Sequence, residues 1–157
     1  MSDFAVEANM TIDELELEPV AREAAALLKQ MHPNLEFTSG RRTIFQQAHA
    51  MARNIVELHD RQWIAKTYIA GAKLQHWVDT HPQADTVDEL TAGLEQTMNA
   101  MSDAEVLKIS RHLTGNAFDI RPVAENSAAI VADIEGLPGL VKFLQKEGGF
   151  VRWHAQF

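Results

Sequence analysis

Two short segments, residues 110–119 and 153–157, limit the folds open to this chain because together they offer the ligands of one metal ion. His112 and Asp119 are seven positions apart in the first segment, and His154 lies in the second. Catalytic zinc usually takes three protein ligands and leaves a fourth position for water. Two imidazoles and one carboxylate supply such a set, so the pattern predicts an open zinc site.

The residues between the first two ligands favour a turn followed by a strand. Gly115 permits a backbone turn or a close approach that a side chain would block, and residues 117–120 have the pattern of a strand. We therefore expect Asp119 to project from a strand and His112 from the loop before it. An alternative stays open, because short motifs recur by chance: Ser110 caps a turn, His112 is a surface histidine and Asp119 is a strand-edge acid.

This segment resembles a motif of the zinc D-Ala-D-Ala carboxypeptidase and dipeptidase family, which also includes phage L-alanyl-D-glutamate endopeptidases. The family motif is Ser-x-His-x-x-Gly-x-Ala-x-Asp. Every fixed position of the motif is matched here, by Ser110, His112, Gly115, Ala117 and Asp119.

Two further elements extend the resemblance from about residue 35 to the last residue. Residues 39–43 are similar to a Ser-Gly-x-Arg-Ser element at the end of a strand, with Arg42 on the arginine position. Gln47 matches a glutamine that often follows this element. His154 resembles the family's C-terminal histidine, and Gln156 resembles the glutamine after it in the phage enzymes.

The resemblance implies a hedgehog-type α+β fold, with helices packed on a small antiparallel sheet and Zn²⁺ held by His112, Asp119 and His154 at the face of the sheet. The implied activity is hydrolysis of bacterial cell-wall peptides that contain D-amino acids. Zinc would lower the pKa of its bound water and polarise the scissile carbonyl. Arg42 would stabilise the developing oxyanion or bind a substrate carboxylate.

Substrate binding is the role that the resemblance suggests for Ser110 and Gln156. The cationic role of Arg42 has alternatives elsewhere in the sequence, each of which is more simply part of a salt bridge. These alternatives are Arg41, Arg111 and Arg152.

One position departs from the family's pattern. The family has its catalytic Glu or Asp three residues before the last histidine, where this chain has Val151. Valine neither accepts nor donates a proton, so the general acid/base role is unfilled there. On a regular strand residue 151 would also face away from His154, unless the backbone bulged between the two.

Other acids are therefore candidates for the acid/base role. Glu147, beside two glycines, is the nearest acid upstream and is the predicted replacement, with a solvated helix-end residue as the alternative. A further group lies in a helical insertion that we expect at about residues 60–108, where acids most simply form a solvated face. Its members are Asp79, Asp85, Asp88, Glu89 and Glu95.

Composition narrows the functional classes. A chain of 157 residues with 46% hydrophobic content fits a single domain over residues 1–157. A net charge of -8 argues against binding to nucleic acid or anionic lipid. The absence of cysteine leaves only His, Asp and Glu as metal ligands.

The sequence also bears on location. No apolar run approaches the roughly 18 residues of a membrane span, so we expect no membrane insertion. The acidic N-terminus lacks the basic segment and the apolar core of a signal peptide. We therefore expect a chain made in the cytoplasm that reaches the cell wall after release or as part of a virion.

Local patterns predict the secondary structure. We expect an irregular arm over residues 1–10 and, after 43, a helix that packs over the sheet. Strands are predicted at about 35–38, 117–123 and 150–154. Helices are predicted at about 19–31, 43–58, 65–80, 86–98, 102–109, 125–135 and 140–146.

Two other functional classes remain beside a phage lytic or virion enzyme. One is a metal-binding module that has lost hydrolysis and binds a wall peptide or a protein partner, which Val151 favours. The other is a structural phage protein whose zinc only stabilises the fold. Arg42 counts against both, since a purely structural zinc does not need it. The sequence leaves the oligomeric state open.

Overall fold

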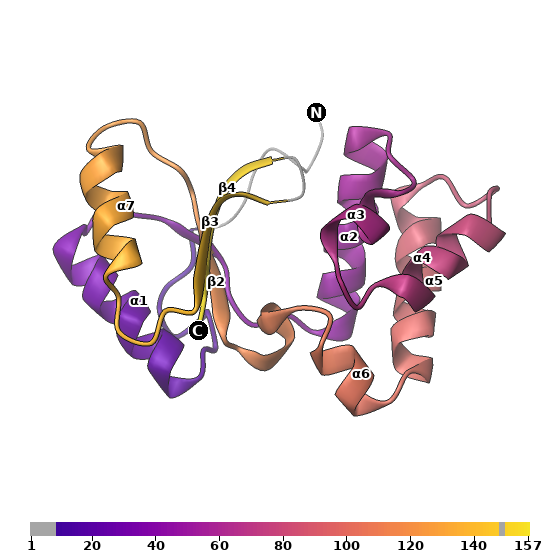
Figure 1. The fold of residues 1–157 in the computed structure, drawn as a ribbon, viewed down its shortest axis with the longest axis horizontal. Coiled ribbons are helices and arrows are strands. Elements are labelled where there is room, and N and C mark those ends of the chain that lie inside the picture. The colour runs from indigo at the N-terminus through magenta and orange to yellow at the C-terminus, as the bar shows by residue number, and fades with distance from the viewer. Residues whose placement is uncertain (1–8, 148–149) are drawn as a thin grey trace. The chain divides into compact units, whose positions relative to one another are not determined.

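A computed structural model describes residues 9–147 and 150–157 (Figure 1). The arm expected at residues 1–10 lies outside this part except at its end, where Met10 forms an isolated antiparallel bridge with Phe37. The described residues are α+β, with helices and a four-stranded antiparallel sheet, as predicted. Among the helices described, none is both long and apolar enough to cross a membrane.

The chain divides into two compact units. One consists of Met1–Arg41 and Thr114–Phe157 and is called the sheet unit below. The other, Arg42–Leu113, is called the helical unit. The single domain expected over residues 1–157 stays a prediction.

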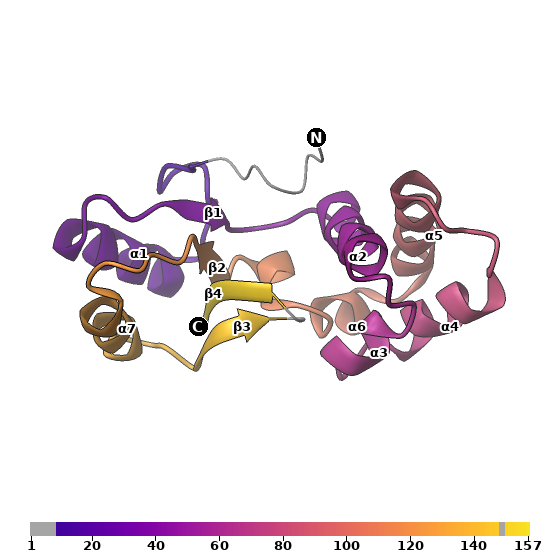
Figure 2. The ribbon, with the colours of Figure 1, turned by 90° about the horizontal axis from the view of Figure 1, so that it is seen from above.

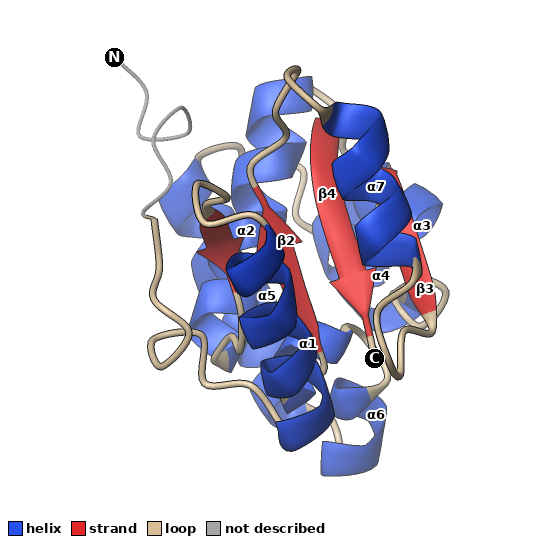
Figure 3. Cartoon of the chain, turned by 90° about the vertical axis from the view of Figure 1, so that its left-hand side faces the viewer, coloured by secondary structure: helices blue, strands red, loops and turns tan. Residues whose placement is uncertain are grey.

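The sheet has the strand order β1, β2, β4, β3, and all neighbouring strands are antiparallel. The strands are β1 Phe37–Ser39, β2 Ala117–Ile120, β3 Lys142–Glu147 and β4 Phe150–Gln156. The C-terminal strand β4 therefore lies between β2 and β3 (Figure 3). Asp119 on β2 pairs with His154 on β4, so two of the predicted ligands are direct cross-strand neighbours.

Two helices, α1 (Pro19–Met31) and α7 (Ser127–Glu135), cover one face of the sheet (Figure 1). They share a buried apolar cluster with three of the strands, and burying a large apolar side chain contributes about 1.5–3 kcal/mol. Its members include Ala21, Leu28, Phe37, Phe118, Ile120, Ile130, Ile134, Trp153 and Ala155. Because strand residues alternate between faces, Asp119 and His154 point to the opposite face of the sheet.

Local signals set the start and the end of α1. Pro19 occupies the first helical position, where a missing N–H costs nothing, and the helix ends before His32. Upstream, Thr11 and Glu14 form a capping box. The Thr11 N–H donates to Glu14 Oε1 at 2.9 Å, and the Glu14 N–H donates to Thr11 Oγ1 at 3.2 Å. This box begins a turn rather than a helix.

The helical unit is built around a second buried cluster. Its helices are α2 Ile44–Leu58, α3 Trp63–Thr67, α4 Ala72–Thr80, α5 Val87–Ala100 and α6 Asp103–Leu107. Helices α2 and α5 pack against each other (Figure 2). Thr43, Thr86 and Ser102 cap α2, α5 and α6 by accepting a hydrogen bond from a backbone N–H three residues on. The predicted helical character of residues 60–108 is thus confirmed.

Two predictions about helices in this unit need correction. The buried side chains of α2, among them Met51 and Ile55, belong to the cluster of the helical unit rather than to that of the sheet, because α5 offers them an apolar partner face. The helix predicted over 65–80 is broken into α3 and α4. A Cβ at Gly71 would lie 2.8 Å from Ile64 Cγ2, so the two helices approach closely at this break.

The prediction of a helix over residues 140–146 is wrong, since residues 142–146 belong to strand β3. Apolar residues at 140, 143 and 144 fit a helical spacing, but pairing with β4 overrides the local pattern. Phe143 packs edge-on against Trp153, with ring centroids 6.4 Å apart. The strand predicted over 117–123 ends at Ile120, shortly before Pro122, which has no N–H to donate to a sheet.

Candidate metal centre

Asp119 and His154 form a buried polar pair on the sheet face that α1 and α7 leave uncovered. Their side chains are 1% and 5% exposed, and Asp119 Oδ1 lies 2.8 Å from His154 Nδ1. The antiparallel register of β2 and β4 places the two residues directly opposite each other. Side chains at such positions are close enough to share one ligand.

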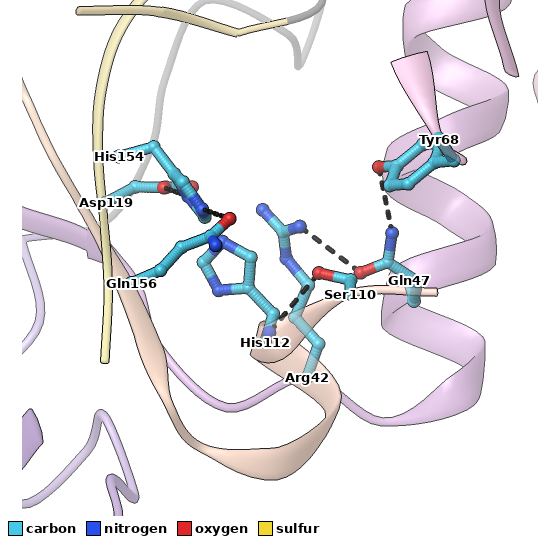
Figure 4. Close-up of polar contacts among 8 residues, drawn as sticks. All are labelled: Arg42, Gln47, Tyr68, Ser110, His112, Asp119, His154 and Gln156. Atoms are coloured by element: carbon cyan, nitrogen blue, oxygen red, sulfur yellow. Dashed lines mark hydrogen bonds and ion pairs between the residues drawn. The ribbon is translucent and has the colours of Figure 1, made fainter. Parts of the chain in front are cut away.

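Gln156 lies two residues beyond His154 on β4 and points to the same face. Its Oε1 is 2.9 Å from Nε2 of His154, so both ring nitrogens of this histidine have a partner. Figure 4 shows the three side chains together. From the sequence we expected Gln156 to bind substrate. No sequence pattern predicted that its side chain would contact His154.

His112 lies on the short 3-10 helix Arg111–Thr114, within which the division between the two units falls. This helix leads into β2 through Gly115, whose φ is +75°. The His112 side chain is buried, its backbone N–H donates to Ser110 Oγ at 3.2 Å, and its carbonyl accepts from the Arg42 N–H at 2.8 Å. Ser110 therefore caps this turn, as the simpler interpretation had it.

The structure brings the three predicted ligands together. One ligand atom from each of His112, Asp119 and His154 lies within 4.8 Å of the other two, and all three residues are buried. At zinc–ligand distances near 2.0 Å, tetrahedral ligands are about 3.3 Å apart. The set therefore fits a metal ion if the distance between Asp119 Oδ1 and His154 Nδ1 increases by about 0.5 Å and the His112 ring moves slightly toward them.

Arg42 is held within the helical unit by a chain of polar contacts. Its Nη1 donates to Oε1 of Gln47 at 3.3 Å, and Nε2 of Gln47 donates to the hydroxyl of Tyr68 at 3.1 Å (Figure 4). Gln47 is fully buried near the start of α2. The motif had pointed to Arg42 and Gln47, whereas nothing in the pattern around Tyr68 indicated its part in this chain.

Val151, at the position where the family has its catalytic acid, lies on strand β4. Val151 is 66% exposed. The register of β3 and β4 shifts here: Leu144 pairs with His154, but Lys146 pairs with Val151. Three steps along β4 thus match two along β3, which is the bulge that the sequence had left open. The side chain of Glu147, the predicted replacement, lies outside the described part of the structure.

Two other candidates, Arg41 and Asp79, have ordinary structural contacts. Arg41 donates from Nε to the Glu16 carbonyl at 2.9 Å and from Nη2 to Glu18 Oε1 at 2.7 Å. In the helical unit Asp79 accepts hydrogen bonds from Gln62 and Gln75 at 3.0 and 2.8 Å. These contacts support the structural interpretation of Arg41 and Asp79.

No protein-family model, curated protein or solved structure matches this chain. Any proposal for its function therefore depends on the geometry above and on the motif residues themselves.

Proposed function

We propose that this chain is a zinc-dependent peptidase that hydrolyses bonds in bacterial cell-wall peptides. The observation that carries the proposal is the buried group of His112, Asp119 and His154. Two imidazoles and one carboxylate, buried with a ligand atom of each within 4.8 Å of the others, are donor types that zinc binds, so the group favours a metal-binding role. The resemblance around the same residues favours hydrolysis of wall peptides.

The donor set suits zinc. Imidazole and carboxylate are common zinc ligands, and three of them leave a position open. When bound, zinc supplies Lewis acidity and a coordinated water of lowered pKa. The chain's own contribution is to hold two histidines and one aspartate in a buried place on a rigid sheet and an adjoining turn.

Arg42 is proposed to bind a substrate carboxylate or the developing oxyanion. Its contact with the buried Gln47, which in turn contacts Tyr68, orients the guanidinium in advance. A donor group held in this way needs little free energy to reorient when negative charge develops. Arginine also suits a carboxylate because its donors form a planar fork.

The remaining roles follow from the chemistry of each side chain. Glu147 is proposed to accept a proton from the attacking water and to return it to the leaving amine. Ser110 uses its oxygen to accept the His112 N–H, so its hydroxyl hydrogen can donate to a substrate carbonyl. The natural setting of such an enzyme would be phage lysis or a virion that penetrates the wall.

Release of amines from purified peptidoglycan tests the proposal. We expect the zinc-loaded wild type to release amines and His112→Ala to release none, because the variant loses a metal ligand. Glu147→Gln should keep its zinc and lose about 10²–10⁴-fold in rate. His76→Ala removes an exposed histidine on α4 and should behave as wild type. Equal release by wild type and His112→Ala would contradict the proposal.

A second candidate is a zinc-binding protein of the same fold that no longer hydrolyses peptides and has a peptide-binding or structural role. The exposed Val151 at the position of the usual acid favours it. In that case the wild type binds zinc and releases no amines. Val151→Glu then places a carboxylate at the position where the family has its acid, and amine release by this variant but not by the wild type would support this candidate.

A further inference from the structure

Both ring nitrogens of His154 face oxygen atoms. Nδ1 lies 2.8 Å from Asp119 Oδ1, and Nε2 lies 2.9 Å from Gln156 Oε1. A carboxylate oxygen and an amide oxygen only accept hydrogen bonds. With the Gln156 amide in this orientation, Nε2 carries the proton and donates it to Oε1. Between Nδ1 and the carboxylate a positive species is required, and this can be a proton or a metal ion.

We propose that Gln156 is a positioning residue for the metal, which rests on the metal site proposed above. By accepting the Nε2–H of His154, Gln156 fixes the tautomer in which Nδ1 keeps its lone pair beside Asp119. A metal ion can then replace the proton between Nδ1 and the carboxylate. Metal-bound histidines generally donate their second ring N–H to such a partner, which also fixes the orientation of the ring.

The geometry of β4 supports this role. His154 and Gln156 are two residues apart on one strand, so their side chains lie on the same face without any turn between them. The Gln156 backbone is anchored separately, since its carbonyl accepts the Val141 N–H at 2.8 Å and it pairs with Ala117 on β2. Substitution of the side chain therefore leaves the strand pairing in place.

Metal binding through Nε2 of His154, instead of Nδ1, predicts the opposite effect of Gln156 on zinc affinity. If the metal bound Nε2, Gln156 would compete with it for the nitrogen, and Asp119 would hold the proton on Nδ1. Removal of the Gln156 side chain would then tighten metal binding. The proposed arrangement requires that the same removal weaken it. The sign of the change in zinc affinity thus separates the two.

The experiment measures the dissociation constant for Zn²⁺ with the full-length chain by competition with a zinc chelator. For Gln156→Ala we expect weakening by about 10- to 100-fold. Gln156→Glu retains an acceptor for Nε2–H and should restore affinity to the wild-type level or better. Gln145→Ala removes an exposed glutamine from β3 of the same sheet and should leave affinity unchanged.

A spectroscopic measurement on the zinc-loaded chain complements the affinities. With ¹⁵N-labelled histidine, the wild type should show a proton on Nε2 of His154 that exchanges slowly with solvent. In Gln156→Ala the same proton should exchange rapidly, because its acceptor is gone. Unchanged or tighter zinc binding by Gln156→Ala, with one zinc on the wild type, would overturn this inference and leave the proposed function standing. Failure of the wild type itself to bind zinc would overturn both.

Discussion

Gly115 sets the backbone path between His112 and Asp119. Its φ of +75° lies in the left-handed region, which glycine adopts without steric cost. A Cβ at this position would also lie 2.6 Å from Nη2 of Arg41. Arg41 is held by the Glu16 carbonyl and so cannot move away without losing that hydrogen bond.

Gly115→Ala should therefore destabilise the chain and weaken metal binding. Forcing an alanine into this backbone conformation costs about 1–3 kcal/mol, and the 3-10 helix that carries His112 must shift. Chemical denaturation and a zinc titration measure the two effects. Gly136→Ala is the matched control, because Gly136 has a φ of -91° and its Cβ would meet nothing closer than 3.5 Å. Equal stability of the two variants would refute this explanation.

The candidate ligands could be predicted at the residue scale because their spacing follows a known motif. His112, Asp119 and His154 lie together in the structure as the spacing indicated. The contacts of Gln156 and Tyr68 could not be predicted, since a hydrogen bond between side chains depends on rotamers and on neighbours that are distant in sequence. The bulge before His154 depends on β3, which the sequence pattern had assigned to a helix.

At the scale of elements, α4 and α5 meet at a glycine. A Cβ at Gly93 would lie 1.9 Å from the ring of Trp77, so the indole rests directly on the backbone of α5. Glycine in a helix normally costs about 0.5–1 kcal/mol relative to alanine. Close packing of the indole offsets that cost here.

Gly93→Ala should destabilise the helical unit by about 1–2 kcal/mol, because overpacking outweighs the gain in helix propensity. In a Trp77→Ala background the clash is absent, and the same substitution should instead stabilise by about 0.5–1 kcal/mol. Urea denaturation of the four chains of this double-mutant cycle measures the coupling. Additive effects would show that the indole does not explain the glycine.

The N-terminus of α6 makes stability depend on pH. A hydrogen bond from Lys73, and then one from the Ser102 N–H, lower the pKa of Glu105 below its usual value of 4.5. Since the folded pKa is depressed, the stabilisation is present above pH 4.5 and is lost as the pH falls through the folded pKa.

Wild type should lose more stability than Glu105→Gln on acidification from about pH 7 to about pH 3. Glutamine keeps the geometry of a capping box but does not titrate. The urea midpoint of each chain at both pH values measures the difference. Parallel pH profiles for the two chains would contradict this role for Glu105.

Elements with strong local signals could be predicted and those defined by tertiary contacts could not. The helices predicted to begin near residues 19, 86 and 102 are confirmed, and their start signals are Pro19, Thr86 and Ser102. At the break between α3 and α4 Gly71 lies close to Ile64, and β3 is hydrogen-bonded to β4. Neither contact is visible in a local pattern.

At the scale of the whole molecule, residues 9–147 and 150–157 form two buried apolar clusters rather than one. The sheet unit is assembled from both ends of the sequence, and the helical unit is a continuous segment between them. Asp119 and His154 are 35 positions apart and meet because the last strand inserts between β2 and β3. A metal ion bound there would add a cross-link between the middle and the end of the chain.

Zinc should accordingly stabilise the whole chain. At a free concentration 100 times the dissociation constant, a ligand bound only by the folded state adds about 2.7 kcal/mol. For a chain of this size that corresponds to a rise in melting temperature of roughly 5–10 °C. His112→Ala should show little of this rise, and His76→Ala should show all of it.

Zinc content of the purified chain tests the central claim most directly. After loading with zinc and dialysis into metal-free buffer, elemental analysis should find about one zinc per chain in the wild type and in His76→Ala. His112→Ala, Asp119→Asn and His154→Ala should each retain almost none. A wild type without zinc, or ligand variants that hold as much zinc as the wild type, would contradict the assignment of this site.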